Sequence, residues 1–314
     1  MTRLLDLAHS RARRLVSSGA PVYLAVNPIE YHGPHLSLHN DALITAGLVR
    51  DVHEVLVREH GDWPLLVAGD LDVGVDPVPG PGSRPVPFET VCRLVVDACR
   101  ALVGLGAQRV VLATFHGHPL HNVAIGKGAE WLERRGVQVV APFNLLLRAA
   151  VRGEVEAISG AYATVTDPTL RDAMLREAAR DLHAGFGETS LSLHYAPDSV
   201  GDHASLSPCP DVTPDPALGR AARGFRLAGR VDLALELELL AFGKAWFELD
   251  PFPGYTGHPH LANAEAGAVL ARVLSERFAA VVSDVIAGRA RSPRPLFGWM
   301  ERMTLGGRIS TVGR

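Results

Sequence analysis

The sequence has few cysteines, no long apolar run and almost no excess charge. Its three cysteines make no disulfide framework, and Cys92 and Cys99, seven residues apart in a helical pattern, are expected to be buried packing residues. No apolar run approaches the roughly 20 residues of a membrane span, and the start of the chain lacks the apolar core of a signal peptide. The net charge of −3 gives no reason to expect nucleic acid or a membrane surface as a partner. We therefore expect a reduced, cytoplasmic protein.

Apolar runs alternate along the chain with helical patterns. Hydrophobic residues make up 47% of the chain, which is typical of a globular protein with a sizeable core. We predict strands over residues 22–26, 65–68, 110–114 and 137–141, and helices over residues 41–59, 88–105, 121–135, 168–183, near 233–247 and near 262–287. Gly106 and Asp167 are expected to cap helices, and the Gly-, Pro- and Asp-rich residues 69–87 are predicted to form a loop. This alternation predicts a three-layer α/β/α fold, with helices on both faces of a central, mostly parallel sheet.

The chain shows no internal repeat, no low-complexity segment and no linker. We therefore predict a single domain over residues 1–314, with a core of about 20–288. The tail over residues 289–314 carries six Arg against one Glu and has no periodicity. We expect it to lie along the surface or at a contact between subunits.

Acidic residues and histidines follow the first predicted strand. Glu30, His32 and His35 lie within six residues, and Asp41 comes shortly afterwards. Loops at the carboxyl ends of strands are where α/β proteins usually bind ligands. Carboxylate oxygens and imidazole nitrogens together suit a divalent first-row metal ion. Solvated loop residues with one hydrogen-bonded histidine are the alternative for this segment taken alone.

Three histidines, His116, His118 and His121, follow the third predicted strand within six residues. In extended geometry His116 and His118 would point the same way, whereas His121 is expected to begin the next helix. A structural role for His116 is the alternative. A third group, from His183 to Glu188, contains two glycines, which predict a sharp turn that presents both side chains together. Here the alternative is an ordinary helix start after a histidine at a helix end.

Four blocks of sequence, in order, resemble the creatininase family of metal-dependent amidohydrolases. Residues 30–36 with Asp41 are similar to the family's E-x-H-G-x-H-L-P…D signature, and His116 falls in its N-G-H-x-x-N loop. Residues 183–190 are similar to H-A-G-x-x-E-T-S, and residues 254–259 resemble G-x-x-G-D-P. The resemblance spans residues 22 to 287 and implies a creatininase-like fold.

The resemblance also implies a set of metal ligands and a pair of divalent ions, Zn²⁺, Mn²⁺ or Fe²⁺, that share one bridging carboxylate. The implied ligands are Glu30, His32, Asp41, His116 and Glu188, with Asp41 as the bridge between an ion held with Glu30 and His116 and an ion held with His32 and Glu188. His118 stands where creatinine amidohydrolase places a further ligand, so it is an additional candidate.

The same resemblance implies catalytic and supporting residues. His183 is implied as the catalytic general acid, which would protonate the leaving nitrogen after attack by a metal-activated hydroxide. His35 is expected to hold a ligand carboxylate in place.

The implied activity is hydrolysis of a non-peptide C–N bond in a small amide, cyclic amide or formamide. Creatinine itself is not expected, because the family's enclosing aromatic residues correspond to about 143–180, where this chain has no Trp and Tyr162 is the only aromatic residue after Phe143. The alternatives are a peptidase that trims a cofactor-precursor peptide, a ring-opening hydrolase acting on a C–C or C–O bond, and a non-catalytic metal-binding homologue. The expected partner is a small-molecule substrate, with no nucleic acid and no membrane, and the resemblance suggests a homo-oligomer, namely a hexamer.

Overall fold

The computed structural model describes residues 1–309 and is built around a parallel sheet. The strands are β1 (Thr2–Arg3), β2 (Val22–Asn27), β3 (Leu66–Asp72), β4 (Arg109–Ala113) and β5 (Gln138–Val140). Their order is β1-β3-β2-β4-β5, and every neighbouring pair is parallel. The predicted parallel sheet is therefore confirmed, and the four predicted strands correspond to β2 to β5.

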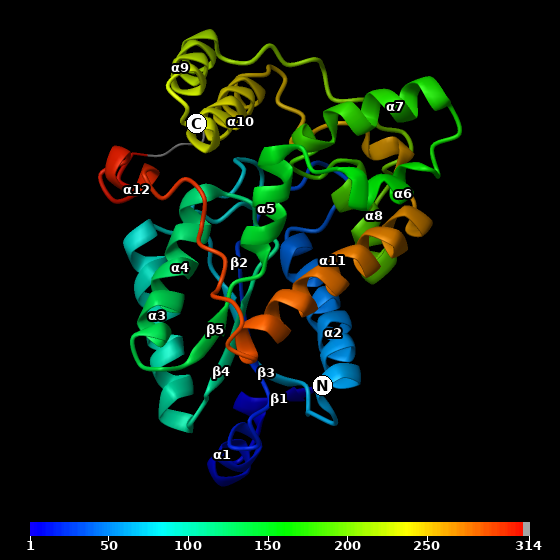
Figure 1. Cartoon of the computed structure of the whole chain (residues 1–314). Helices are drawn as coiled ribbons and strands as arrows, with labels where there is room; N and C mark the ends of the chain where they lie inside the picture. The colour runs from blue at the N-terminus through cyan, green and yellow to red at the C-terminus, as the bar shows by residue number, and fades with distance from the viewer. Residues whose placement is uncertain (310–314) are drawn as a thin grey trace.

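Helices cover both faces of this sheet, because successive strand side chains point to opposite sides. In β2, Val22, Leu24 and Val26 belong to one apolar core, whereas Tyr23 belongs to the other. The predicted α/β/α layering is confirmed, with one layer on each side of the sheet in Figure 1. The first layer contains α3 (Phe88–Leu105) and α4 (Pro119–Glu133), and the second contains α2 (Asn40–His60) and α11 (Ala264–Ile286).

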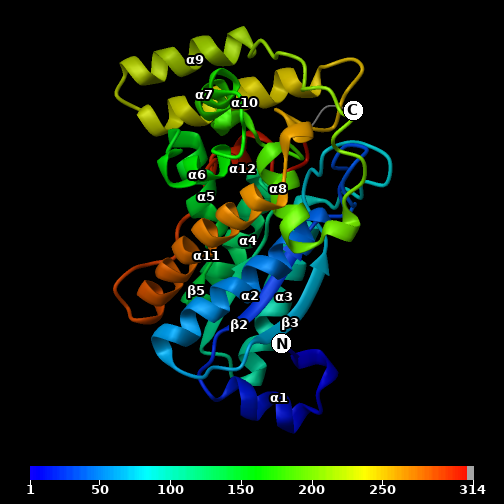
Figure 2. The ribbon, with the colours of Figure 1, turned by 90° about the vertical axis from the view of Figure 1, so that its right-hand side faces the viewer.

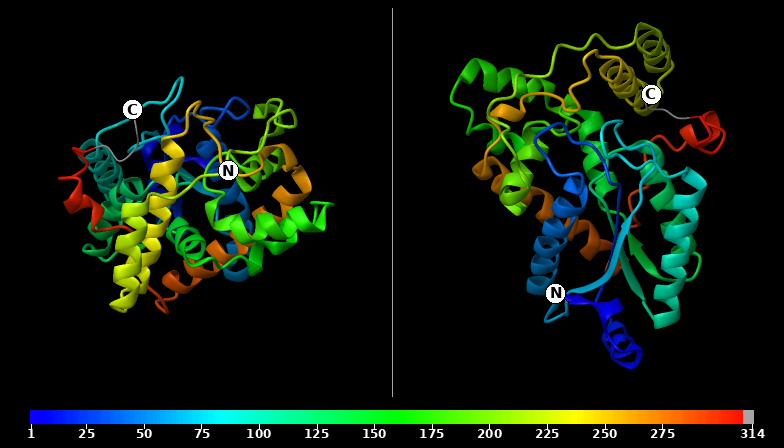
Figure 3. Two further views of the ribbon diagram at one scale, coloured as in Figure 1. Left: turned by 90° about the horizontal axis from the view of Figure 1, so that it is seen from above. Right: turned by 180° about the vertical axis from the view of Figure 1, so that it is seen from behind.

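The carboxyl ends of the parallel strands meet at one edge of the sheet. Above this edge lie the paired helices α9 (Pro216–Leu227) and α10 (Val231–Phe247), as Figures 1 and 3 show. Figure 2 shows α5 (Phe143–Arg152) and α8 (Phe186–Tyr195) between this pair and the sheet. The loops that leave the strands therefore open into a space bounded by helices.

Short elements complete the described chain. They are α1 (His9–Val16), α6 (Ser159–Tyr162), α7 (Pro168–Glu177) and α12 (Met300–Met303), with 3-10 turns η1 (Leu4–Asp6), η2 (Glu156–Ile158), η3 (Ala178–Arg180), η4 (Pro197–Ser199) and η5 (Pro259–Leu261). The Asp167 carboxylate accepts from the backbone N–H of Thr169 and Leu170, and Gly106 ends α3 at φ 99°, so both predicted caps are confirmed. None of the described helices is long and apolar enough to span a membrane.

Two predicted boundaries differ from the structure by four residues or more. Residues Gly69 to Asp72 belong to β3 rather than to a loop, because residues 70–72 pair with residues 25–27 of β2. The predicted helix over 168–183 ends at Glu177 in α7. Beyond η3, the N–H groups of Leu182 and His183 donate to the Thr256 hydroxyl instead of continuing a helix. His183 therefore lies in a loop.

The described part of the tail, residues 289–309, packs along α4 and α10. Phe297 and Met300 are buried. The Phe297 backbone N–H and the Trp299 indole N–H donate to the Glu236 carboxylate of α10, and Lys127 of α4 pairs with Glu301 at 2.7 Å. This agrees with the expected surface-following path, whereas residues 310–314 of the predicted tail lie outside the described residues. The single-domain organisation stays a prediction.

Candidate metal centre

The loop after β2 places Glu30 and His32 at the edge of the sheet. Both side chains are fully buried, at 0% and 1% exposure. The loop turns at Gly33, whose φ of 65° is unfavourable for residues with a side chain and whose added Cβ would lie 3.0 Å from the His35 ring. The chain then enters α2, where Asp41 is buried in the first turn. The sequence places these three groups together because one tight loop joins the strand to the helix.

The His32 ring is oriented by the backbone. Its Nδ1–H donates to the Glu30 carbonyl at 3.0 Å, which leaves Nε2 as the inner nitrogen. This Nε2 lies 3.2 Å from Asp41 Oδ1 and 3.8 Å from oxygens of both Glu30 and Glu188. In the neutral ring, the inner lone pair therefore faces three carboxylates, an arrangement that requires a proton or a cation between them.

His116 repeats this arrangement from the loop after β4. Its Nε2–H donates to the Val75 carbonyl at 3.2 Å, so Nδ1 is the inner nitrogen. That nitrogen lies 2.9 Å from Glu30 Oε2 and 3.5 Å from Asp41 Oδ2. While Nδ1 carries no proton, these two buried carboxylate oxygens have no hydrogen-bond donor. Imidazoles held by an outer N–H and acceptors without donors are the features of a buried cation site.

The buried ligand atoms form three overlapping groups. In each group, one atom per residue lies within 4.8 Å of the others: Glu30, Asp41 and His116; His32, Asp41 and Glu188; and Glu30, His32 and His183. The structure thus brings together all five implied ligands, in the two combinations that share Asp41. The donor set of oxygen and nitrogen atoms fits divalent zinc, manganese or iron.

The third loop is fixed by Asp181, which the sequence analysis did not single out. Its carboxylate accepts from the backbone N–H of Phe186 at 3.1 Å and Gly187 at 2.8 Å, at the start of α8. An added Cβ at Gly185 would collide with this carboxylate. Glu188 follows in the first turn of α8, and its Oε2 accepts from the Ala184 N–H. The glycines and the buried carboxylate together aim Glu188 at His32.

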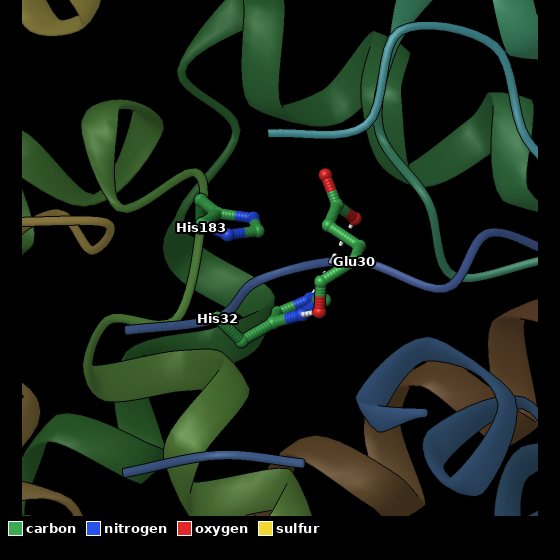
Figure 4. Close-up of side chains that lie close together, drawn as sticks. All are labelled: Glu30, His32 and His183. Atoms are coloured by element: carbon green, nitrogen blue, oxygen red, sulfur yellow. Dashed lines mark hydrogen bonds and ion pairs between the residues drawn. The ribbon is translucent and has the colours of Figure 1, made fainter. Parts of the chain in front are cut away.

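His183 lies against this cluster (Figure 4). Its Nε2–H donates to the Tyr31 carbonyl at 2.8 Å, and its ring stacks on that of His32, with centroids 4.3 Å apart. Burial and the nearby His32 lower the pKa of His183 to about 3. This imidazole is therefore neutral at pH 7, with Nδ1 as the nitrogen able to accept a proton.

The charges in the cluster are strongly coupled. Burial would lower the pKa of both ligand histidines, but Asp41 and its neighbours raise that of His32 to about 10, and Glu30 raises that of His116 to about 9. Burial would raise the Glu30 pKa, yet His116 holds it well below its usual range. Burial raises the pKa of Glu188 to about 8. Without metal, protons therefore occupy the inner nitrogens.

The remaining histidines differ in place and partners. His118 belongs to none of the three groups, and its Nε2 lies 3.8 Å from Asp76 Oδ2. His121 lies in the first turn of α4 rather than at its start, and its Nε2–H donates to the Val26 carbonyl. His35 does not hold a ligand carboxylate as expected; its Nε2 is hydrogen-bonded to the Thr189 hydroxyl at 2.9 Å, and so it supports the residue next to Glu188.

A family model described as Creatininase: Creatinine amidohydrolase matches residues 6–282. This chain belongs to the creatininase family. The resemblance inferred from four short motifs is confirmed, and the description of the family model is that of an amidohydrolase, an enzyme that hydrolyses a C–N bond other than a peptide bond. No curated protein matches the sequence.

Solved creatininase structures share the fold of this family member. A structure named Creatininase Mn is 21% identical, with a TM-score of 0.57 over 90% of this chain and 98% of the other. A mutant creatininase complexed with creatine is 21% identical, with a TM-score of 0.59 over the same shares. A putative creatinine amidohydrolase from Bacteroides fragilis NCTC 9343 is 17% identical, with a TM-score of 0.56 over 85% and 90%. At these identities the likeness shows the fold.

In this creatininase-family chain an aromatic residue lies beside the cluster, although the segment over 143–180 lacks Trp. The Trp246 ring of α10 lies 5.7 Å from that of His183, and its indole N–H donates to the Tyr255 carbonyl at 3.0 Å. Neither Trp246 nor Asp181 lies in one of the metal-ligand motifs. The only available sequence signal for Asp181 was its position just ahead of the glycine-rich turn.

Proposed function

We propose that this chain is a metal-dependent hydrolase of a non-peptide C–N bond in a small amide, cyclic amide or formamide. The observation that carries the proposal is the inward-facing pair of nitrogens on His32 and His116. Each ring is held by its outer N–H to a backbone carbonyl, and each inner nitrogen faces carboxylates. Backbone-tethered imidazoles of this kind are typical of metal ligands.

In this proposal Glu30, Asp41 and His116 would hold one divalent ion, and His32, Asp41 and Glu188 would hold a second. His118 is a further candidate ligand. The names of solved relatives, Creatininase Mn and a mutant creatininase of Zn-Zn type, favour manganese or zinc, and iron suits the same donors. Ions bound at such a site lower the pKa of water and polarise the amide carbonyl.

His183 moves the proton that the reaction requires. It is buried beside the cluster with its Nε2–H held by the Tyr31 carbonyl, so Nδ1 is the nitrogen that would accept the proton of the attacking water. It then returns that proton to the leaving nitrogen as the C–N bond breaks. The hydrogen bond from Nε2–H to the Tyr31 carbonyl keeps the tautomer and the ring orientation through both transfers.

The partner, the oligomeric state and the cellular location stay as the sequence predicts them. We expect a small-molecule substrate, a homo-oligomer such as a hexamer, and a cytoplasmic location.

The proposal is tested by turnover on a panel of lactams, formamides and primary amides, measured as amine, ammonia or formate release. We expect release that is abolished by chelation, restored by Mn²⁺ or Zn²⁺, and lost in Asp41→Asn. The matched control is Asp97→Asn, because Asp97 is 62% exposed on α3 and pairs only with Arg100 among the described residues. Turnover that survives both chelation and Asp41→Asn would contradict the proposal, whereas two bound ions with no release from any amide would favour the non-catalytic alternative.

A further inference from the structure

A large cavity adjoins the cluster on the side of α10. Its volume is about 510 Å³, within the roughly 300–1,000 Å³ of sites that enclose a drug-sized ligand. Glu30, His116, His183 and Glu188 line it together with apolar side chains from several other parts of the chain. These include Leu146 and Leu147 of α5, Leu239 and Leu240 of α10, and Phe297 and Met300 of the tail. A polar reaction centre thus lies in the wall of an apolar chamber.

Basic side chains in the described lining are already paired. Besides histidines, the lining contains Lys244 and Arg277. Lys244 contacts Asp215 and lies 3.5 Å from Glu248, and Arg277 lies 3.7 Å from Glu154. A carboxylate or phosphate on a bound molecule would therefore find no uncompensated cation among these side chains. Its desolvation would be unfavourable in the apolar chamber.

Trp246, the aromatic residue beside the cluster, also presents an apolar surface to the cavity and no free polar group. The Trp246 indole N–H is bound to the Tyr255 carbonyl, so it is not available to a ligand. Phe247 and Phe252 pack around the indole, with ring centroids 4.8 and 4.9 Å away. This packing holds the Trp246 side chain of α10 in place beside His183.

Resting on the proposed hydrolase function, we infer that the substrate is a neutral amide or lactam carrying a large apolar group. The amide lies at the cluster, and the apolar group fills the chamber between α5, α10 and the tail. Burial of that group supplies binding energy in proportion to its area, whereas a small polar ring would leave most of the chamber unfilled.

The inference is tested with straight-chain hydroxamic acids, which chelate divalent metals. Binding of the acetyl, butanoyl, hexanoyl and octanoyl members to protein with its metals retained is measured by calorimetry. We expect affinity to rise about fourfold per added methylene. Leu147→Gln should flatten this rise and leave acetohydroxamate binding unchanged. Leu145→Gln is the matched control, since Leu145 is on the same helix and outside the lining.

The outcomes distinguish failure of the apolar substrate class from failure of the proposed hydrolase function. Affinity that is equal for all chain lengths overturns the apolar substrate class but leaves the metal hydrolase standing. Failure of metal-loaded protein to bind any hydroxamate overturns the proposed function as well. The wild-type series decides the question alone if Leu147→Gln does not fold, which circular dichroism would reveal. A rise that persists unchanged in a folded Leu147→Gln places the apolar group elsewhere and contradicts the inference.

Discussion

The imidazole of His183 stacks on that of His32, with ring centroids 4.3 Å apart and an angle of 28° between the planes. One ring belongs to a candidate metal ligand and the other to the candidate proton carrier. Each donates its outer N–H to a backbone carbonyl, His32 to Glu30 and His183 to Tyr31. Both acceptors lie in the loop after β2, so this loop fixes the position of the metal ligand and of the proton carrier relative to each other.

Because the proton carrier and the metal ligand are two separate rings, a substitution of His183 should stop proton transfer and leave the metal bound. We expect His183→Ala to lower kcat about 10²- to 10⁴-fold, because a positioned acid–base group contributes that much to catalysis. The bound metal, measured by plasma mass spectrometry, should be unchanged. His9→Ala, a substitution at an exposed histidine of α1, is the control. Unchanged turnover in His183→Ala would show that another group carries the proton.

Metal binding should release protons. In the metal-free chain the carboxylates raise the pKa of His32 to about 10 and that of His116 to about 9, so both rings are protonated at pH 7. A metal ion binds only the neutral imidazole, so each ion displaces at least one proton, and its apparent affinity should rise about tenfold per pH unit from pH 6 to 8. Calorimetry in buffers with different ionisation enthalpies measures the release, and pH-independent affinity would contradict the coupling.

The start of α8 depends on the buried carboxylate of Asp181. Asp181→Ala leaves two backbone N–H groups without their acceptor, and we expect a loss of about 1–3 kcal/mol in the free energy of unfolding. Asp181→Asn keeps one oxygen acceptor and should lose less. Chemical denaturation measures both variants against Asp172→Ala, a substitution at an exposed position of α7. Equal stability of Asp181→Ala and this control would show that the carboxylate does not hold the loop.

The carboxyl group of Asp181 should also make the free energy of unfolding depend on pH. Burial raises its pKa from 3.8 to about 6, so the folded state holds this proton more tightly than the unfolded chain. Its contribution to stability is fully present below pH 3.8 and is lost as the pH rises through about 6. Asp181→Asn should remove that part of the pH profile between pH 4 and 7. A profile identical to wild type would exclude Asp181 as its source.

The packing of α8 on α11 should tolerate no side chain at Gly267. An added Cβ there would lie 2.0 Å from the Ser190 carbonyl oxygen, which is backbone and cannot rotate away. We expect Gly267→Ala to cost about 1–3 kcal/mol or more and to lower metal content, because α8 carries Glu188. Gly104→Ala in α3 meets nothing within 4 Å and should be neutral or stabilising. Thermal unfolding of the two variants compares them directly, and equal melting temperatures would contradict the close contact.

The sequence could predict the ligand cluster because each ligand lies beside a local signal. Glu30 and His32 follow one buried strand and His116 follows another, and parallel strands bring such loops to the same edge. Glu188 was found through its glycine-rich turn and the family motif. The end of β3 was missed because Gly69 and Asp72 read as a loop, whereas backbone pairing with β2 extends the strand there.

The chamber could not be predicted in the same way. Its walls combine α5, α10 and the tail, and residues such as Leu147 and Phe297 carry no motif and meet only after folding. Trp246 likewise reaches His183 from a distant part of the chain. Apolar residues of this kind read simply as core, so only the tertiary arrangement distinguishes a packed interior from an apolar chamber.

The most direct test of the account is the metal content of the purified protein, measured with and without Asp41→Asn. Asp41 is shared by both proposed ions, so the account predicts about two tightly bound divalent ions per wild-type chain, none in Asp41→Asn, and two in Asp97→Asn. A wild-type protein that binds no divalent ion at saturating Mn²⁺ or Zn²⁺, or an Asp41→Asn variant that keeps both ions, would contradict it.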